Sequence, residues 1–499
     1  MAVALPVFFA AAGRRFLASL LIPLAAVTGC TEQSDDAIRF GIATAPSELD
    51  PRFATDAISD RIARLLYRPL VAFDERAMPV PELASWERLA NTHYRFELVN
   101  GARFTNGDQI SAADVTSTYR SILDPDGASP HRKSLSNILR VEAIDSRHID
   151  FFLHRPDALF PATLVIGIMS ESDVQKGEQR VFSGDFSLVK RTHNGGVQLL
   201  RRRDGQVVSF VVIKDVTARV LRLVSGDLDL LQGGLSPELF RWLEQQPDVT
   251  VQRTAGSTFS YLGFNWADDV TGKRAVRQAV AHAIDRSAII EHVFTGTARP
   301  AGGFFPPEHW AGHHRLTGYD FDPVRARALL AEAGGLDRPL RMEYKTSSDR
   351  FRQRIAVVIQ DQLRDVGIEV TVASHEWGTF YGDIKSGRFQ SYGLSWVGLK
   401  LPDIFRYAMH STSAPPAGAN RGHYLSKPVD ALIERAEREQ SLARAAEHYR
   451  EIAELLLYDL PFIPLWYEDQ LVVTRTNIVG YSTNEDGHFA ALADTYRRP

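Results

Sequence analysis

The segment between residues 338 and 374 constrains the fold of this chain more than any other. Two stretches with strand character, RPLRMEYKT and IEVTVAS, flank RIAVVIQDQLRDVG, whose apolar residues recur at helical spacing. Parallel strands require a crossover of this kind, so the order strand–helix–strand predicts a parallel α/β unit. The α/β class therefore follows for at least this part of the chain.

The C-terminal half is rich in helical patterns. Residues 273–294 predict a single amphipathic helix, residues 322–334 predict another, and residues 429–461 predict a pair. The apolar face of the first helix consists of Val276, Ala279, Val280, Ala283 and Ile284. Two stretches rich in Pro and Gly, 299–315 and 413–422, lack such a period, and we expect them to be loops.

The N-terminal half carries more strand patterns. Residues 94–110 predict two strands that turn at Asn100–Gly101, and residues 140–265 are mostly strand-like. Ser111 is a predicted helix N-cap, with Asp114 in the capping-box position three residues later.

The only cysteine, Cys30, follows a leader with the three parts of an export signal. Arg14 and Arg15 supply the positive region, residues 16–27 form the apolar run, and small residues precede Cys30. This run is too short to span a membrane, which takes about 20 residues. The stretch VTGC also resembles the lipobox of bacterial lipoproteins. We therefore predict that Cys30 is acylated and anchors the mature chain; an ordinary signal peptide with an incidental cysteine is the alternative.

Cleavage before Cys30 would leave 470 residues, a length that favours two or three lobes over a single core. The full chain has a formal charge of −4, and loss of the two leader arginines makes it −6. A nucleic-acid binder would have a basic footprint, so the charge argues against that class.

Tests for familiar catalytic motifs fail. The stretch HEWGT has Thr379 where the metalloprotease motif H-E-x-x-H has its second histidine, and TGKRAV lacks the Ser or Thr of a phosphate loop. The stretch GLSWVG has one residue too many for the G-x-S-x-G nucleophile elbow. One histidine cluster, His309, His313 and His314, adjoins Glu308. We favour a solvated loop over a metal site there, because flexible loops rarely pre-organise ligands.

Six stretches between about residues 40 and 480 follow the order of motifs in one family: PSELDPRFATDAISDRIARLLYRPLVAFD, GARFTNGDQISAADVTSTYRSILDP, VRQAVAHAIDRSAII, YDFDPVRARALLAEAG, IQDQLRDVGIEV and LPFIPLW. Together they resemble the dipeptide-, oligopeptide- and nickel-binding class of ABC-importer solute-binding proteins, family 5. The resemblance covers nearly the whole predicted mature chain.

This resemblance implies an α/β, two-lobed periplasmic-binding-protein-like fold (type II, large peptide-binding cluster), with hinge strands between the lobes and the ligand enclosed in the cleft. We expect a signal peptide over residues 1–29 and a lipid-anchored tether over 30–37. Lobe I would comprise 38–258 and 475–499, with a subdomain inserted at about 75–180, and lobe II would comprise 259–474.

One segment departs from the family pattern. Peptide-binding members have Gly-Trp-x-x-Asp followed by Asp-Pro, and its first acid binds the ammonium group of the peptide. The matching stretch here, SWVGLKLPDIF, keeps Trp396 but has Leu399 at the position of that acid, followed by Lys400. Either Asp403 binds the ammonium instead, or the ligand has no free amino terminus, which the charge of Lys400 favours.

Further ligand-binding candidates follow from the same resemblance. Lys345 and Arg350 lie just ahead of RIAVVIQDQL, where dipeptide binders place a carboxylate-binding arginine; solvated surface charges are the alternative. Core packing is the alternative to a cleft role for Trp396, and likewise for two further candidates, Trp377 and Tyr381. The remaining candidates near the predicted cleft are Tyr261 and Asn265.

The function that this resemblance implies is capture of peptides or peptide-like solutes for an ABC permease. We expect an exported monomer in the periplasm or a similar extracytoplasmic space, anchored to a membrane through Cys30, with no cofactor, no nucleic acid and no catalysis. The alternatives are a nickel or metal-chelate carrier of the same fold, an exported hydrolase, and a tethered sensor that has lost transport.

Overall fold

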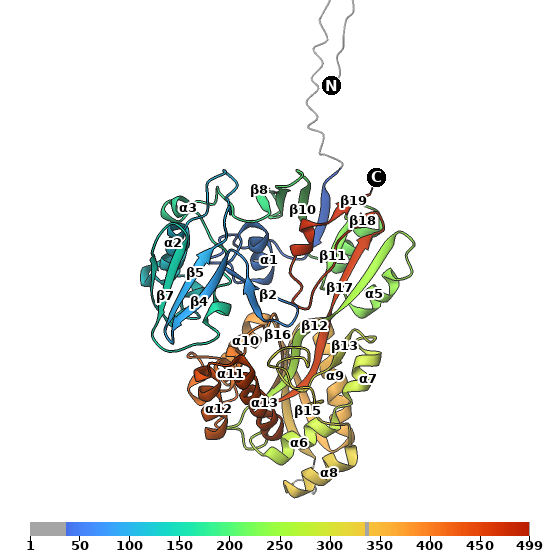
Figure 1. The fold of residues 1–499 in the computed structure, drawn as a ribbon. Coiled ribbons are helices and arrows are strands. Elements are labelled where there is room, and N and C mark those ends of the chain that lie inside the picture. The colour runs from blue at the N-terminus through green and yellow to red at the C-terminus, as the bar shows by residue number, and fades with distance from the viewer. Residues whose placement is uncertain (1–35, 335–338, 499) are drawn as a thin grey trace, which may run out of the picture. The chain divides into compact units, whose positions relative to one another are not determined.

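A computed structural model describes residues 36–334 and 339–498, so the predicted leader and the acylation site at Cys30 lie outside the described residues. Helices and strands are interspersed along the described chain, which confirms the α/β class (Figure 1). None of its helices is both long and apolar enough to cross a membrane.

The strands have the following bounds: β1 Ile38–Ile42, β2 Val71–Phe73, β3 Pro79–Pro81, β4 Ala84–Ala90, β5 His93–Leu98, β6 Ile138–Ala143, β7 His148–Leu153, β8 Phe186–Arg191, β9 Val197–Arg201, β10 Val207–Val212, β11 Leu230–Gln232, β12 Val249–Phe264, β13 Ala298–Pro300, β14 Leu340–Ser347, β15 Ile368–His375, β16 Ser391–Trp396, β17 Phe462–Arg475, β18 Ile478–Val479 and β19 Tyr496–Arg497.

The α-helices have the following bounds: α1 Ala57–Leu66, α2 Ala112–Leu123, α3 Glu171–Lys176, α4 Val216–Val224, α5 Pro237–Leu243, α6 Arg274–Ala283, α7 Arg286–His292, α8 Pro323–Glu332, α9 Arg350–Asp365, α10 Trp377–Lys385, α11 Asp403–Met409, α12 Lys427–Arg438 and α13 Leu442–Asp459.

One large sheet organises the described chain, with the strand order β15-β14-β16-β12-β17-β11-β1-β10-β9-β8 and with β13 against β17. Its two longest strands, β12 and β17, pair antiparallel from Val249 opposite Arg475 to Gly263 opposite Phe462. The pairing shifts register between Thr254 and Thr258 and again between Ser260 and Tyr261. The predicted lobe boundaries fall within these two strands and stay a prediction.

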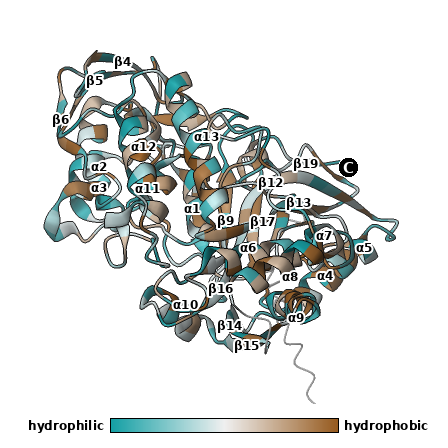
Figure 2. Ribbon diagram, turned by 90° about the horizontal axis from the view of Figure 1, so that it is seen from below, coloured by the Kyte–Doolittle hydropathy of each residue, from teal (hydrophilic) through white to brown (hydrophobic). Residues whose placement is uncertain are grey.

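The predicted parallel strand–helix–strand unit at residues 338–374 is confirmed. Strands β14 and β15 are parallel, in register from Leu340 opposite Ile368 to Ser347 opposite His375. The connecting helix α9 buries Ile355, Ala356, Ile359 and Leu363 in the hydrophobic core of this part of the sheet. Each CH₂ group buried there contributes about 0.8 kcal/mol, so this apolar stripe fixes how the crossover packs. Figure 2 shows that α9 and its neighbours α6 and α8 carry both hydrophobic and hydrophilic residues.

A second, smaller sheet with the order β4-β5-β7-β6 lies within the predicted insertion at about 75–180. Helix α2 packs on it through an aromatic cluster that includes Tyr119, Phe151 and Phe160. The predicted capping box of α2 is confirmed, because the backbone N–H of Ser111 donates to the carboxylate of Asp114 at 2.8 Å.

Three local predictions are wrong. Residues 273–294 form two helices, α6 and α7, because Ile284 is extended and Asp285 caps α7 by accepting from the N–H of Ala288. After Asn100–Gly101 the second predicted strand is reduced to an isolated bridge between Arg103 and Gln109, since β5 pairs with β4 and β7 instead. Helices α3, α4 and α5 interrupt the segment that looked mostly strand-like. The apolar face predicted for 273–294 is buried as expected.

Candidate functional site

The candidate site is a cavity at the carboxyl ends of β14, β15 and β16. These three strands are mutually parallel, and α/β sheets bind ligands at this edge. The cavity has a volume of about 250 Å³. Its lining includes Ser260, Tyr261, Tyr344, Thr346, Ser347, Arg352, Trp377, Phe380, Ser395 and Val397.

A polar network forms one wall of the cavity. The guanidinium of Arg352 donates two hydrogen bonds to the carboxylate of Glu468, at 2.6 and 3.0 Å. The hydroxyl of Ser260 also donates to Glu468 and lies 2.6 Å from that of Ser395. Burial alone would raise the pKa of Glu468, but the neighbouring charge of Arg352 outweighs it and the pKa is lowered. The carboxylate is therefore held ionised, and its charge balances that of Arg352.

Aromatic side chains, among them Trp377 and Phe380, form another part of the lining. The ring of Trp377 stacks on that of Tyr381, with centroids 5.4 Å apart and planes at 5°. The side chain of Trp377 is exposed, so its free face is open to a ligand. A second cavity of about 20 Å³ shares Tyr261 with the first and is lined by Tyr392, Trp396 and Arg421. The structure thus brings four predicted residues together: Tyr261, Trp377, Tyr381 and Trp396.

Arg421, Arg352 and Glu468 are charged residues of this site that the sequence analysis missed. Arg421 donates to the hydroxyls of Tyr261 and Tyr381 at 3.0 and 3.3 Å. Its guanidinium also lies 4.9 Å from the ring centroid of Trp396. Arg421 lies within the Pro- and Gly-rich stretch 413–422, and no periodic pattern marks it. Arg352 lies only two residues beyond the predicted Arg350, so proximity to that segment was the one available signal.

The two cationic candidates near α9 have different surroundings. The Nζ of Lys345 is buried and lies 2.8 Å from the carboxylate of Asp383. Lys345 and Arg388 together lower the pKa of Asp383, so the charge of Lys345 is already balanced. Arg350 is exposed at the first residue of α9 and does not line either cavity. The role of each in ligand binding stays a prediction.

The divergent segment after Trp396 connects with a distant part of the chain. Leu399 packs against the hydrophobic cluster around Phe405, while the ammonium group of Lys400 forms an ion pair with Asp486. Asp403 is exposed at the start of α11 and makes no ion pair with a described residue. The surrounding protein nevertheless shields it from bulk water, and Asp157 and Glu437 add negative charge, so its pKa is raised to about 6.

Asn265 does not line either cavity. It follows Phe264, which pairs with Ser391 at the start of β16, whereas the larger cavity lies at the other end of that strand. Its side-chain amide donates to the backbone carbonyls of Gly387 and Phe389, at 3.3 and 3.0 Å. These contacts hold the turn that leads into β16.

The three histidines do not converge. His309 is buried, so the expectation of a solvated loop is wrong for this residue. Its Nε2 lies 2.9 Å from the carbonyl of Lys400, and its Nδ1 accepts from the N–H of Ala311, which leaves no ring nitrogen for a metal. Burial lowers its pKa to about 4. His313 contacts Glu454 and His314 is exposed. No group of three or more metal-ligating side chains forms within 36–334 and 339–498.

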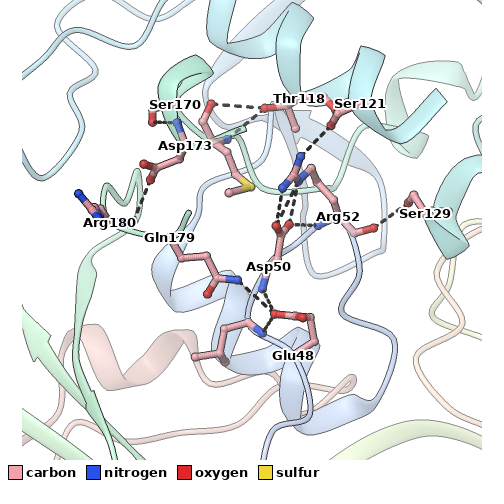
Figure 3. Close-up of polar contacts among 12 residues, drawn as sticks. Glu48, Asp50, Arg52, Thr118, Ser121, Ser129, Ser170, Asp173, Gln179 and Arg180 are labelled. Carbon is pink, nitrogen blue, oxygen red and sulfur yellow. Dashed lines mark hydrogen bonds and ion pairs between the residues drawn. The ribbon is translucent and has the colours of Figure 1, made fainter. Parts of the chain in front are cut away.

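The opening motif SELDPR, residues 47–52, contributes no residue to the lining of the cavity. Asp50 and Arg52 form a buried ion pair at 2.6 Å, and Arg52 also reaches Ser121 of α2 (Figure 3). The carboxylate of Glu48 accepts hydrogen bonds from the backbone N–H groups of Leu49 and Asp50 and from the side-chain amide of Gln179. These contacts fix the segment ahead of α1 to the part of the chain around the smaller sheet.

Comparison with known proteins agrees with this architecture. The family model described as bacterial extracellular solute-binding proteins, family 5 Middle, matches residues 78–416. Di/tripeptide-binding protein 2 of Pseudomonas aeruginosa (strain UCBPP-PA14) is 27% identical, over 93% of this chain and 95% of the relative.

Two solved structures are similar over 93% of this chain. DppA from Helicobacter pylori in complex with the peptide STSA has a TM-score of 0.78 at 25% identity, over 98% of its length. NikZ from Campylobacter jejuni in complex with Ni(L-His) has a TM-score of 0.79 at 21% identity, over 99% of its length. The resemblance inferred from the motifs and the two-lobed fold are both confirmed. The chain belongs to the bacterial extracellular solute-binding proteins of family 5.

Proposed function

We propose that the protein captures peptides or peptide-like solutes outside the cytoplasm and delivers them, chemically unaltered, to the permease of an ABC importer. The names of the di/tripeptide-binding relative and of the peptide complex of DppA support the ligand class. The observation that carries the proposal is the cavity at the ends of β14, β15 and β16. Its aromatic wall at Trp377 suits varied side chains, and its strand ends offer backbone groups to an extended ligand.

Capture would proceed by closure of two lobes, lobe I over 38–258 and 475–499 and lobe II over 259–474. Strands β12 and β17 connect the two parts of the sheet, and their register shift near Thr254 is a natural place for bending. A ligand shifts the population toward the closed form only by the contacts that it makes there. Acylation of Cys30 would keep the monomeric protein beside its permease.

Native mass spectrometry of freshly purified protein tests this function. We expect a bound mass that tandem analysis identifies as a peptide or peptide derivative, and that stays unchanged on incubation with the protein. Turnover of that molecule would contradict the proposal and favour a hydrolase. A nickel-dependent rise in Tm that is lost in His313→Ala and His314→Ala would instead favour the metal-chelate alternative.

A further inference from the structure

Arg421 differs from the other buried arginines of the described chain in what surrounds its charge. Arg52 and Arg201 pair with the acids Asp50 and Asp204. The remaining buried arginines, Arg219, Arg277 and Arg286, donate to backbone carbonyls.

Arg421 exposes only 7% of its surface, yet it forms no ion pair with any carboxylate of the described residues. Its two hydrogen-bond partners are the hydroxyls of Tyr261 and Tyr381. A buried charge is costly unless it is paired, so this guanidinium lacks the counter-charge that its burial calls for.

The geometry leaves hydrogen-bonding capacity for a ligand. A guanidinium has five N–H donors, and two of those of Arg421 are used by the tyrosines. Burial raises the pKa of Tyr261 well above its usual value, so this hydroxyl is neutral and supplies no balancing charge. Trp396 and Tyr381 lie against the guanidinium, with ring centroids 4.9 and 5.5 Å away, which fixes its orientation.

The loop that carries Arg421 is held in place by its neighbour. The side-chain amide of Asn420 donates to the carbonyls of Tyr424 and His410 at 2.7 and 3.2 Å. The loop is thus braced on both sides of Arg421, and its guanidinium is pre-organised for a planar anion.

We propose that Arg421 binds a carboxylate group of the ligand, by paired hydrogen bonds of the kind that arginine forms with planar anions. This inference rests on the proposed function and names the ligand group that the site selects. Arg421 lines the smaller cavity, which shares Tyr261 with the larger one, so this proposal places the anionic end of the ligand on the Tyr261 side of the site. Arg352 is the other arginine of the site, but Glu468 already balances its charge.

The test measures binding of three peptide mixtures to the full-length protein after ligand removal by unfolding and refolding. The first is a casein hydrolysate, and the second is the same hydrolysate methyl-esterified at its carboxyl groups. The third consists of synthetic peptides amidated at the C-terminus but retaining Asp and Glu side chains. Binding is read as the shift in Tm and as the dissociation constant from calorimetry. The proteins compared are wild type, Arg421→Gln, Arg421→Lys, and Arg341→Gln as a control at an exposed arginine of β14.

We expect the untreated hydrolysate to bind wild type and Arg341→Gln equally. Esterification or Arg421→Gln should weaken binding by about 10- to 150-fold, as loss of a charge-assisted hydrogen bond requires. Arg421→Lys should recover part of the affinity. The effect of esterification should vanish in Arg421→Gln. Binding of the amidated mixture would assign the carboxylate to an acidic side chain, and its failure would assign it to the chain end.

Two outcomes overturn the inference in different ways. If wild type binds the esterified and untreated hydrolysates equally, carboxylate recognition by Arg421 is wrong while peptide capture stands. If none of the mixtures binds wild type, the proposed function itself is contradicted, and the inference with it. The Tm of each ligand-free variant shows whether a loss of binding reflects loss of the fold.

Discussion

The ammonium group of Lys400 and the carboxylate of Asp486 form an ion pair that joins the segment after β16 to the C-terminal segment of the chain. The two side chains are 20% and 13% exposed, and Lys400 also lies 4.9 Å from the ring centroid of Phe73. Lys400 was expected to oppose a cationic ligand. Because Asp486 balances its charge, this argument against a free ligand ammonium loses its basis.

Removing either partner of this ion pair should lower the free energy of unfolding, and the effects of the two removals should not be additive. We expect Lys400→Met and Asp486→Asn each to destabilise the protein. The double variant should lose less than their sum, with a coupling energy of about 1 kcal/mol. Urea unfolding of the four proteins measures it. The exposed pair Arg325 and Glu332 is the control, where the same cycle should give less than about 0.5 kcal/mol. Equal couplings for the two pairs would contradict a structural role for Lys400.

Glu468→Gln should destabilise the protein by about 2 kcal/mol, because it leaves the charge of Arg352 without its partner. The pair is only partly shielded, with Arg352 34% exposed, so the loss is smaller than for a fully buried pair. Glu332→Gln, at an exposed position of α8, should change stability by less than about 0.5 kcal/mol. Thermal and urea unfolding distinguish the two variants; a loss at Glu468 no larger than at Glu332 would refute the role given to this network.

Asp403→Asn should stabilise the ligand-free protein at neutral pH and have little effect near pH 4. The pKa of Asp403 is raised to about 6 from 3.8, so the folded state holds its proton more tightly than the unfolded state. This contribution to stability is present at low pH and is lost as the pH rises through about 6. Urea unfolding at several pH values between 4 and 7 tests it. A difference between variant and wild type that does not change with pH would contradict the raised pKa.

His309→Asn should weaken the dependence of the unfolding free energy on pH between about 4 and 6.5. The pKa of His309 falls from 6.5 to about 4 on folding, so its contribution is present above 6.5 and lost as the pH falls toward 4. At pH 7, His309→Asn should cost about 1–3 kcal/mol through the lost contact with the carbonyl of Lys400. His314→Asn, at an exposed position, should leave the profile unchanged. Identical profiles for the two variants would show that His309 is not buried as described.

The strand–helix–strand unit could be predicted because its pattern is local. The apolar stripe of α9 and the two strands that flank it are adjacent in the sequence, so hydrophobic periodicity alone predicts all three elements. The break between α6 and α7 could not be predicted, because the apolar period continues across Ile284. Only the capping contact of Asp285 interrupts the helix there.

The candidate site was predictable only where the family motif covers it. Trp396 lies in the segment that matches the ligand segment of the family, and the structure places it near Tyr381 and Trp377, around the two neighbouring cavities. Arg421 meets Tyr261 across 160 positions of the chain, and Arg352 meets Glu468 across 116. No local pattern encodes such a meeting, because tertiary packing alone brings these side chains together.

Strands β12 and β17 lie side by side through the middle of the large sheet. A pair of adjacent ribbons bends easily across its flat face, but resists twisting and sideways shear, which would break the hydrogen bonds between them. Bending across the face of this strand pair near Thr254 is therefore the deformation that breaks the fewest of its hydrogen bonds. A proline or an inserted residue near Thr254 should therefore change the rates of ligand uptake and release without changing any residue that contacts the ligand.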